Sequence, residues 1–199
     1  CVMNRAATLT RVLVIRPGAT DFDDQGRMKG SLDMPLSDQG LEQARSLADE
    51  LSSFQIKTLF CAPCESARET ASLIAGRQRQ RGSETKVKVL DAFRNLDHGL
   101  WHGKLIDEVR RNHPKVYRQG ADHPDEFCPP EGEPVAEVKA RITKSVRKCV
   151  KKGREELVAI LVTEPLASIV ESELSGNDLE SLWSRENDDA SWTLLEAEG

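Results

Sequence analysis

The sequence lacks any long apolar run. No segment approaches the roughly 20 apolar residues that a membrane-crossing helix needs, and the opening stretch CVMNRAATLT contains no apolar signal segment. We therefore expect a cytoplasmic protein with no membrane partner. Internal repeats and low-complexity linkers are also missing, and 199 residues are enough to build one full hydrophobic core. The sequence thus predicts a single domain over residues 1–199.

The sequence also lacks an excess of positive charge and a cysteine spacing typical of disulfide-rich proteins. The formal net charge of −5 argues against a general nucleic-acid binder, so no nucleic-acid partner is expected. The chain has five cysteines, an odd number without scaffold-like spacing, which favours a reducing compartment over a disulfide framework. No motif requires a cofactor or a metal, and we expect neither.

What the chain does contain is an alternation of apolar runs and helical patterns. Residues 11–15 (RVLVI) and 157–163 (LVAILVT) are nearly unbroken branched apolar runs, typical of central parallel strands. Shorter strand candidates are residues 57–60 and 87–90, and helical spacing fills residues 38–52, 65–75 and 135–150. This order predicts a three-layer α/β/α sandwich with a mostly parallel sheet, in which residues 191–195 form an antiparallel edge strand.

Two stretches are predicted to be irregular: the polar residues 77–86 and the proline-rich residues 123–134. In α/β sheets, ligands bind outside the carboxyl ends of the strands. We therefore expect the loops after Ile15, Phe60, Leu90 and Val162 to form the walls of any pocket.

Several motifs in those loops resemble the histidine phosphatase superfamily, the phosphoglycerate mutase-like group, from about residue 11 to residue 196. The family's Arg-His-Gly-Glu-Thr after the first strand is similar to residues 16–20 (RPGAT), and its next signature is similar to residues 26–44 (GRMKGSLDMPLSDQGLEQA). Further similarities are APCESARETA (62–71), LDHGLWHG (96–103), PEGEP (130–134) and the final NDDASWTLLE. The resemblance implies a phosphoglycerate mutase-like fold.

The resemblance also implies a mechanism. In the family a neutral histidine attacks phosphorus, two arginines and a second histidine hold the phosphate oxygens, and an acid protonates the leaving group. Of these positions only Arg16 carries the family's residue. The nucleophile position is Pro17, the second arginine is Ser66, the acid is Asn95 and the second histidine is Glu164. With Pro17 and Glu164 in place, the family's phosphohistidine cannot form at position 17.

We therefore expect a catalytically inactive member, a pseudoenzyme with a binding, regulatory or structural role and an unknown protein partner or small anionic ligand. Its remnant pocket is predicted to hold Arg16, Gly18, Thr20, Ser66, Asn95, Asp97, His98 and Glu164. Because Arg16 and Glu164 follow neighbouring strands, they are expected to form a two-pronged ion pair, with the pKa of Glu164 lowered and with Ser66 or Asn95 adding a hydrogen bond. For Arg16 a purely structural pairing is favoured, and for Gly18, Gly30, Gly40, Gly99 and Gly103 turn geometry is expected.

Three alternatives stay open. One is a repurposed phosphohydrolase that uses Asp97, Glu164 or His98. Another is a dithiol redox protein that uses Cys61 and Cys64, because Cys-x-Pro-Cys between a strand and a helix is typical of such sites. A metal pair at His98 and His102 is disfavoured for want of a third ligand. The basic residues of 139–154 are expected to form a solvated helix face that could also contact an acidic partner.

Overall fold

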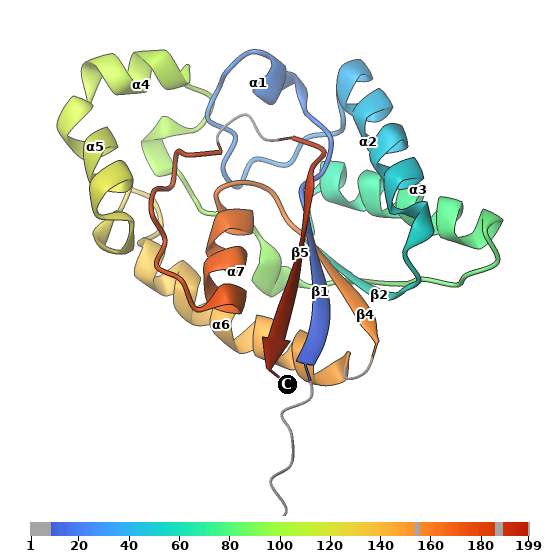
Figure 1. Cartoon of the computed structure of the whole chain (residues 1–199). Coiled ribbons are helices and arrows are strands. Elements are labelled where there is room, and N and C mark those ends of the chain that lie inside the picture. Colours follow the sequence, from blue (N-terminus) through green and yellow to red (C-terminus); the bar gives the residue numbers. More distant parts are fainter. Residues whose placement is uncertain (1–8, 154–155, 186–188, 199) are drawn as a thin grey trace, which may run out of the picture.

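A computed structural model describes residues 9–153, 156–185 and 189–198. Its centre is a five-stranded sheet in the order β3-β2-β4-β1-β5 (Figure 1). The strands are β1 (Leu9–Ile15), β2 (Ile56–Cys61), β3 (Lys86–Val89), β4 (Leu157–Leu161) and β5 (Trp192–Glu198). β1 pairs in parallel with β4, β4 with β2 and β2 with β3, whereas β5 runs antiparallel to β1 at the edge. Both the adjacency of the two apolar runs and the antiparallel edge strand are confirmed.

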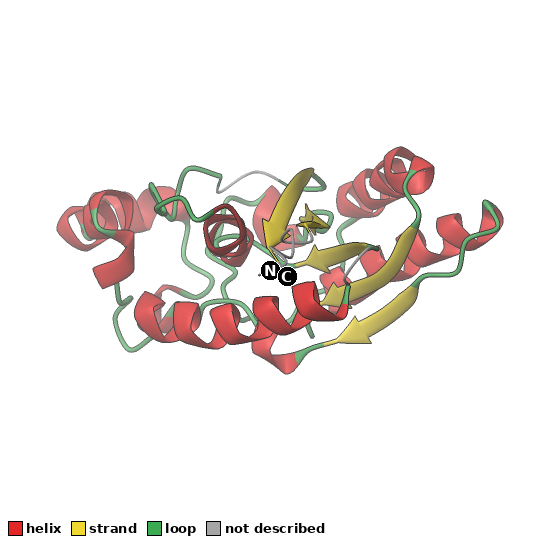
Figure 2. Cartoon of the chain, turned by 60° about the horizontal axis from the view of Figure 1, so that its bottom comes forward, coloured by secondary structure: helices red, strands yellow, loops and turns green. Residues whose placement is uncertain are grey.

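Helices cover both faces of the sheet (Figure 2). α2 (Asp38–Glu50) and α3 (Glu65–Gln80) pack together on one face, and α6 (Val135–Lys152) and α7 (Leu166–Ser175) pack together on the other. β1 from Val12 to Ile15 and all of β4 are buried, because they lie between these layers. The predicted three-layer α/β/α fold is confirmed, while the single-domain organisation stays a prediction.

Shorter elements lie around the carboxyl ends of the strands. They are α1 (Asp21–Asp24), α4 (Ile106–Asn112), α5 (Pro114–Asp122) and the single 3₁₀ turns Asp91–Phe93, Gly99–Trp101 and Pro124–Glu126, whereas a further 3₁₀ turn, Leu51–Ser53, precedes β2 at its amino end. In Figure 1, α1 stands at the top, above the end of β1, and α4 and α5 lie at the upper left. These elements therefore build the rim of whatever site lies there.

The structure corrects two sequence expectations about helices. α3 continues to Gln80, through part of the stretch predicted to be a polar connection, because its arginines and glutamines are good helix formers on an exposed surface. α4, α5 and α7 were not predicted. α4 and α5 are short, and α7 begins soon after the buried strand β4. None of the three therefore shows the long periodic pattern on which helix prediction depends. No helix among the described residues is long and apolar enough to cross a bilayer.

A close contact between two backbones fixes the loop after β1. A Cβ on Gly40 would lie 1.9 Å from the carbonyl oxygen of Ala19, and a Cβ on Gly18 would lie 2.1 Å from that of Gly40. These two glycines are needed for close approach, and not for the turn geometry expected of them; Gly30, Gly99 and Gly103 do have positive φ. The contact holds the Arg16–Thr20 loop against α2.

Candidate active site

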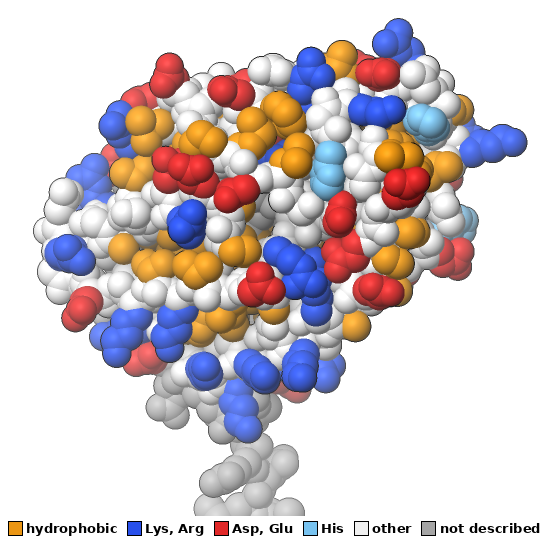
Figure 3. Space-filling model, turned by 180° about the vertical axis from the view of Figure 1, so that it is seen from behind, with side chains coloured by type: hydrophobic (Ala, Val, Ile, Leu, Met, Phe, Trp, Pro, Cys, Tyr) orange, Lys and Arg blue, Asp and Glu red, His pale blue; other side chains and the backbone are white. Residues whose placement is uncertain are grey.

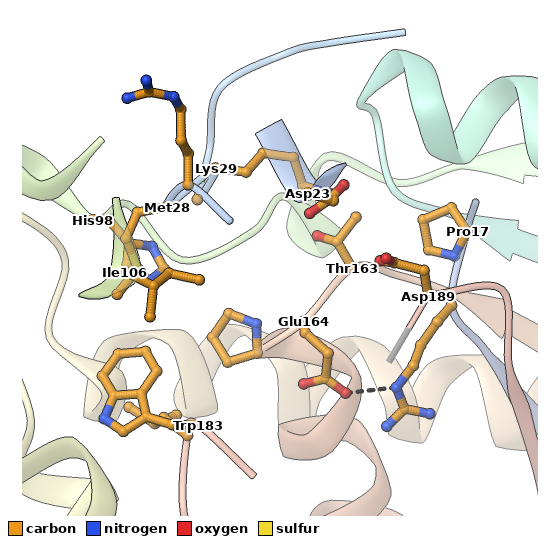
Figure 4. Close-up of a pocket in the computed structure, with 15 residues that line it drawn as sticks. Pro17, Asp23, Met28, Lys29, His98, Ile106, Thr163, Glu164, Trp183 and Asp189 are labelled. Atoms are coloured by element: carbon orange, nitrogen blue, oxygen red, sulfur yellow. Dashed lines mark hydrogen bonds and ion pairs between the residues drawn. The ribbon is translucent and has the colours of Figure 1, made fainter. Parts of the chain in front are cut away.

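A pocket opens at the carboxyl ends of β1 and β4 (Figure 4). Its walls come from the loop after β1, the α1 region, the loop before α7 and the segment that precedes β5. It has a volume of ≈ 60 Å³ and is lined by Arg16, Pro17, Asp23, Arg27, Met28, Lys29, Gly30, His98, Ile106, Thr163, Glu164, Pro165, Leu182, Trp183 and Asp189. The site therefore lies where the topology of the sheet predicts it.

Arg16 and Glu164 form the expected ion pair inside this pocket. Arg16 Nε donates to Glu164 Oε1 at 2.6 Å, the contact dashed in Figure 4, and the side chains are 1% and 13% exposed. The two-pronged geometry is wrong, because Arg16 Nη1 instead donates to Glu171 Oε1 at 3.0 Å. Of the predicted extra partners, Asn95 does donate a hydrogen bond to Glu164, although to its backbone carbonyl, at 2.8 Å, and Ser66 does not. The carboxylate accepts instead from the Ser168 hydroxyl, one helical turn away, at 2.9 Å. Sequence reasoning missed Glu171 and Ser168 because both lie on the unpredicted helix α7.

Burial and ion pairing act in opposite directions on the pKa values of these two groups. It raises the pKa of Glu164, and the charge and hydrogen bond of Arg16 only partly oppose this effect, so the expected lowering is wrong. Burial also opposes the charge of Arg16, but its contacts with Glu171 and Glu164 outweigh that effect and raise its pKa. Arg16 therefore stays cationic, held by two carboxylates.

His98 is the only histidine in the pocket lining, and its ring orientation is fixed. Its Nδ1 lies 3.1 Å from the carbonyl oxygen of Leu96. A carbonyl can only accept, so Nδ1 carries the proton and Nε2 carries the lone pair of the neutral ring. Burial lowers the pKa of His98 to about 4, which keeps the ring neutral at physiological pH.

His98 also packs against the loop that supplies the cation Lys29. A Cβ on Gly30 would lie 2.6 Å from His98 Nδ1, so only glycine allows this approach. The neighbouring His102 uses Nε2 to accept from the backbone N–H of Ser31 and of His98, at 3.2 Å each. Because His98 Nδ1 and His102 Nε2 both form hydrogen bonds with backbone groups, the two histidines are not arranged as a pair of metal ligands.

The charged side chains that line the pocket balance one another. The cations are Arg16, Arg27 and Lys29, and the carboxylates are Asp23, Glu164 and Asp189. Lys29 Nζ lies 2.7 Å from Asp23, whereas Arg27 Nη1 donates to the carbonyl of Gly103 at 2.8 Å. Arg27 and Lys29 were not predicted, although both lie within the GRMKG stretch that carries the resemblance.

The opposite wall of the pocket is apolar. In Figure 4, Trp183 and Ile106 lie on the side of His98, away from Asp189 and Pro17. Trp183 is stacked on Tyr117 with ring centroids 4.9 Å apart, and its Nε1 donates to the carbonyl of Tyr117 at 2.8 Å. No motif marked Trp183, because its loop reaches the site only through the tertiary fold.

Ser66 and Asn95 lie in an adjoining cavity of ≈ 150 Å³ and not in the pocket itself. The two hollows share Lys29, Gly30 and Thr163. The Asn95 amide donates to the carbonyl oxygens of Gly30 and Glu164, at 3.1 and 2.8 Å. Asn95 thus connects the loops between the two hollows.

The other predicted pocket residues lie elsewhere. Thr20 caps α1, where its hydroxyl accepts from the backbone N–H of Asp23. Gly18 is buried against Gly40, and Asp97 lines a separate surface depression, where it accepts from the backbone N–H of Gly99 at 2.8 Å. Gly18, Thr20 and Asp97 therefore do not belong to the described lining of the pocket.

The cysteine pair lacks the property that redox chemistry requires. Cys61 is fully buried, and burial together with Cys64 raises its thiol pKa to about 12. A redox-active thiol needs the opposite shift, so the structure does not support the dithiol alternative.

Most of the basic run in 139–154 is solvated, as expected. Lys144, Lys148, Lys151 and Lys152 are exposed on α6, and lysines and arginines gather along the lower part of the rear face in Figure 3. Arg141 is an exception: it turns inward to Glu133 at 3.0 Å and to the carbonyl of Ala92 at 2.6 Å. It therefore braces the loop that leads to Asn95.

Comparison with known proteins places this fold and site in context. A model of the family described as "Histidine phosphatase superfamily (branch 1)" matches residues 12–199. "Phosphoserine phosphatase 1" of Hydrogenobacter thermophilus is 28% identical over 96% of this chain and 88% of its own. "Adenosylcobalamin/alpha-ribazole phosphatase" of Escherichia coli is 20% identical over 94% of this chain and 89% of its own. The solved structure "Bacillus stearothermophilus YhfR" superposes with a TM-score of 0.81 at 25% identity, covering 96% of this chain and 92% of its own.

These comparisons contradict the expectation of a catalytically inactive protein. The relatives that align with nearly the whole chain are named as phosphatases, which points to an active phosphatase. The expectation was wrong because it judged the chemistry from four motif positions and left out other polar side chains of the same motifs that line the pocket, among them Lys29 and His98. The fold, the ordered loops and the family match together show that this chain belongs to the histidine phosphatase superfamily, branch 1.

Proposed function

We propose that the pocket hydrolyses an organic phosphate ester and that His98 is its nucleophile. The observation that carries this proposal is the fixed, neutral imidazole of His98 beside the Lys29–Gly30 loop. An imidazole lone pair is the nucleophile on which the family's chemistry depends, and Pro17 cannot supply one. The names of the relatives support the reaction class.

The pocket supplies the other parts that such a reaction needs. Lys29 and Arg27 hold the anionic oxygens of the ester. His98 Nε2 forms a bond to phosphorus as the ester P–O bond breaks, and the departing oxygen takes a proton from water. Water then cleaves the P–N bond, which releases the phosphate and restores the imidazole.

Release of p-nitrophenol from p-nitrophenyl phosphate tests this proposal. His98→Asn keeps a donor for the Leu96 carbonyl but removes the nucleophile, so the rate should fall by about 10³-fold or more. His123→Asn, at an exposed histidine remote from the pocket lining, is the matched control and should keep the parent rate. Quenching during turnover with alkaline detergent should leave phosphate on His98, stable in alkali and lost in acid, and mass spectrometry under non-acidic conditions should locate it. A parent protein that releases no p-nitrophenol, or a His98→Asn variant within threefold of the parent, contradicts the proposal.

We further infer a cytoplasmic location. Cys61, Cys64, Cys128 and Cys149 are all unbridged thiols, which supports a reducing compartment. Fractionation of the native cells, with detection of this chain by antibody, tests the location.

A further inference from the structure

The cavity beside the active-site pocket is large enough to hold a chemical group of its own. Its ≈ 150 Å³ match the size of a protein cavity that accepts benzene. It opens next to the pocket, because Lys29, Gly30 and Thr163 line both hollows. A ligand that reaches the junction between the two can therefore extend in two directions.

The cavity exists because short side chains line it. Ser66 is 1% exposed at the start of α3, and its hydroxyl lies 3.7 Å from Cys64 Sγ. This is the position at which the family pattern has an arginine, whose longer side chain would take up room that Ser66 leaves open. Asn95 points its amide at backbone carbonyls and so does not fill the space either. Leu32, Ala62 and Pro63 supply an apolar part of the wall, against which an organic group can pack, while the charged side chains of Lys29, Asp33 and Arg94 line other parts of it.

The charge of the site favours an ester with a single negative charge. Among the residues that the structure describes, three cations and three carboxylates line the pocket (Arg16, Arg27 and Lys29 against Asp23, Glu164 and Asp189), and the formal charges of these six cancel. Two of the cations already contact carboxylates, Arg16 at 2.6 Å and Lys29 at 2.7 Å. A phosphate monoester carries close to two negative charges at neutral pH, whereas a diester carries one. A site whose charges balance should therefore bind a diester more tightly than a monoester.

We propose that the preferred ligand of this site is a phosphodiester. Its phosphate lies at the junction formed by Lys29 and Thr163. One organic group lies in the pocket against Trp183, and the other enters the cavity beside Ser66 and Cys64. This deepens the proposed function and rests on it for the reaction. One P–O bond of the diester breaks, one alcohol leaves with a proton, and water supplies the hydroxyl that remains on the phosphate monoester product.

The test compares bis(p-nitrophenyl) phosphate with p-nitrophenyl phosphate. The parent should prefer the diester in kcat/KM by about tenfold or more. Ser66→Leu fills the cavity and should reduce this diester-to-monoester preference by at least tenfold, and Cys64→Met, which fills it from another wall, should act in the same direction. Ser72→Leu, at an exposed position of the same helix, should leave the preference unchanged. Melting temperatures confirm that each variant is folded.

Binding separates failure of this inference from failure of the proposed reaction. Calorimetry with both esters on the His98→Asn variant, with and without Ser66→Leu, gives dissociation constants in the absence of turnover. One outcome is that the parent hydrolyses neither ester while the diester still binds at least tenfold more tightly and Ser66→Leu removes that preference. In that case the phosphodiester inference is supported and the proposed hydrolysis is contradicted. If the monoester is bound or cleaved as well as the diester, or if Ser66→Leu and Cys64→Met leave the preference intact, the inference is overturned.

Discussion

Glu164→Gln should strengthen anion binding while it weakens the fold. The parent carboxylate lies in the pocket and contacts Arg16 at 2.6 Å, so it both repels an incoming phosphate and occupies the cation. At an effective dielectric constant near 20, a unit charge about 5 Å from the anion is worth about 3 kcal/mol. Solvent screening reduces this value, and we expect the dissociation constant of phosphate or sulfate to fall by about 10- to 100-fold.

The same change should cost about 1–3 kcal/mol of unfolding free energy. Breaking a buried ion pair outright costs about 3–5 kcal/mol, but Arg16 keeps its contact with Glu171 at 3.0 Å and the glutamine oxygen can still accept a hydrogen bond. The isosteric change preserves the packing around α7. The cost therefore reflects charge and not lost volume.

Titration calorimetry with sodium phosphate, paired with urea unfolding, measures both effects. Glu171→Gln is the matched control, because Glu171 also contacts Arg16 but does not line the pocket. It should lose comparable stability with a much smaller gain in phosphate affinity. If Glu164→Gln binds phosphate no more tightly than the parent, or if Glu171→Gln gains as much, the repulsion argument is wrong.

Two further predictions concern the buried imidazole and the crossing backbones. The pKa of His98 is about 4 in the folded protein against 6.5 for the ordinary group. Between these two pH values the unfolded chain binds a proton that the folded protein does not bind. The free energy of unfolding should therefore fall by about 3 kcal/mol as the pH is lowered from above 6.5 toward 4. Urea unfolding at pH 7.5 and 4.5 should show this loss in the parent and a smaller one in His98→Asn, and equal losses would contradict it. Gly40→Ala places a Cβ 1.9 Å from the Ala19 carbonyl and should destabilise the protein by about 3 kcal/mol, whereas Gly76→Ala, with nothing within 4 Å on exposed α3, should stabilise it by up to about 1 kcal/mol. Thermal unfolding of the two variants checks this contrast, and a neutral Gly40→Ala would refute the close-approach explanation.

The sequence by itself determined the framework of this protein. Unbroken branched runs can be buried only between two layers, so residues 11–15 and 157–163 had to form central strands, and the alternation of strands and helices left one sensible architecture. The motifs placed the loops in order, and the neighbouring ends of β1 and β4 made the Arg16–Glu164 contact predictable. These conclusions depend on local residue patterns and on the order of the strands and helices, both of which can be recognised in the sequence.

The tertiary structure alone decided the chemistry of the site. Glu171 and Ser168 lie on α7, where they contact Arg16 and Glu164, and Trp183 lines the pocket; all three come from segments without a recognisable pattern, and only the tertiary fold brings them to the site. The pKa of Glu164 is raised although an arginine touches it, because desolvation depends on every atom around the carboxyl group and on no single neighbour. Likewise, a serine in place of an arginine looks like a loss in the sequence, whereas in three dimensions it leaves a cavity beside a neutral histidine.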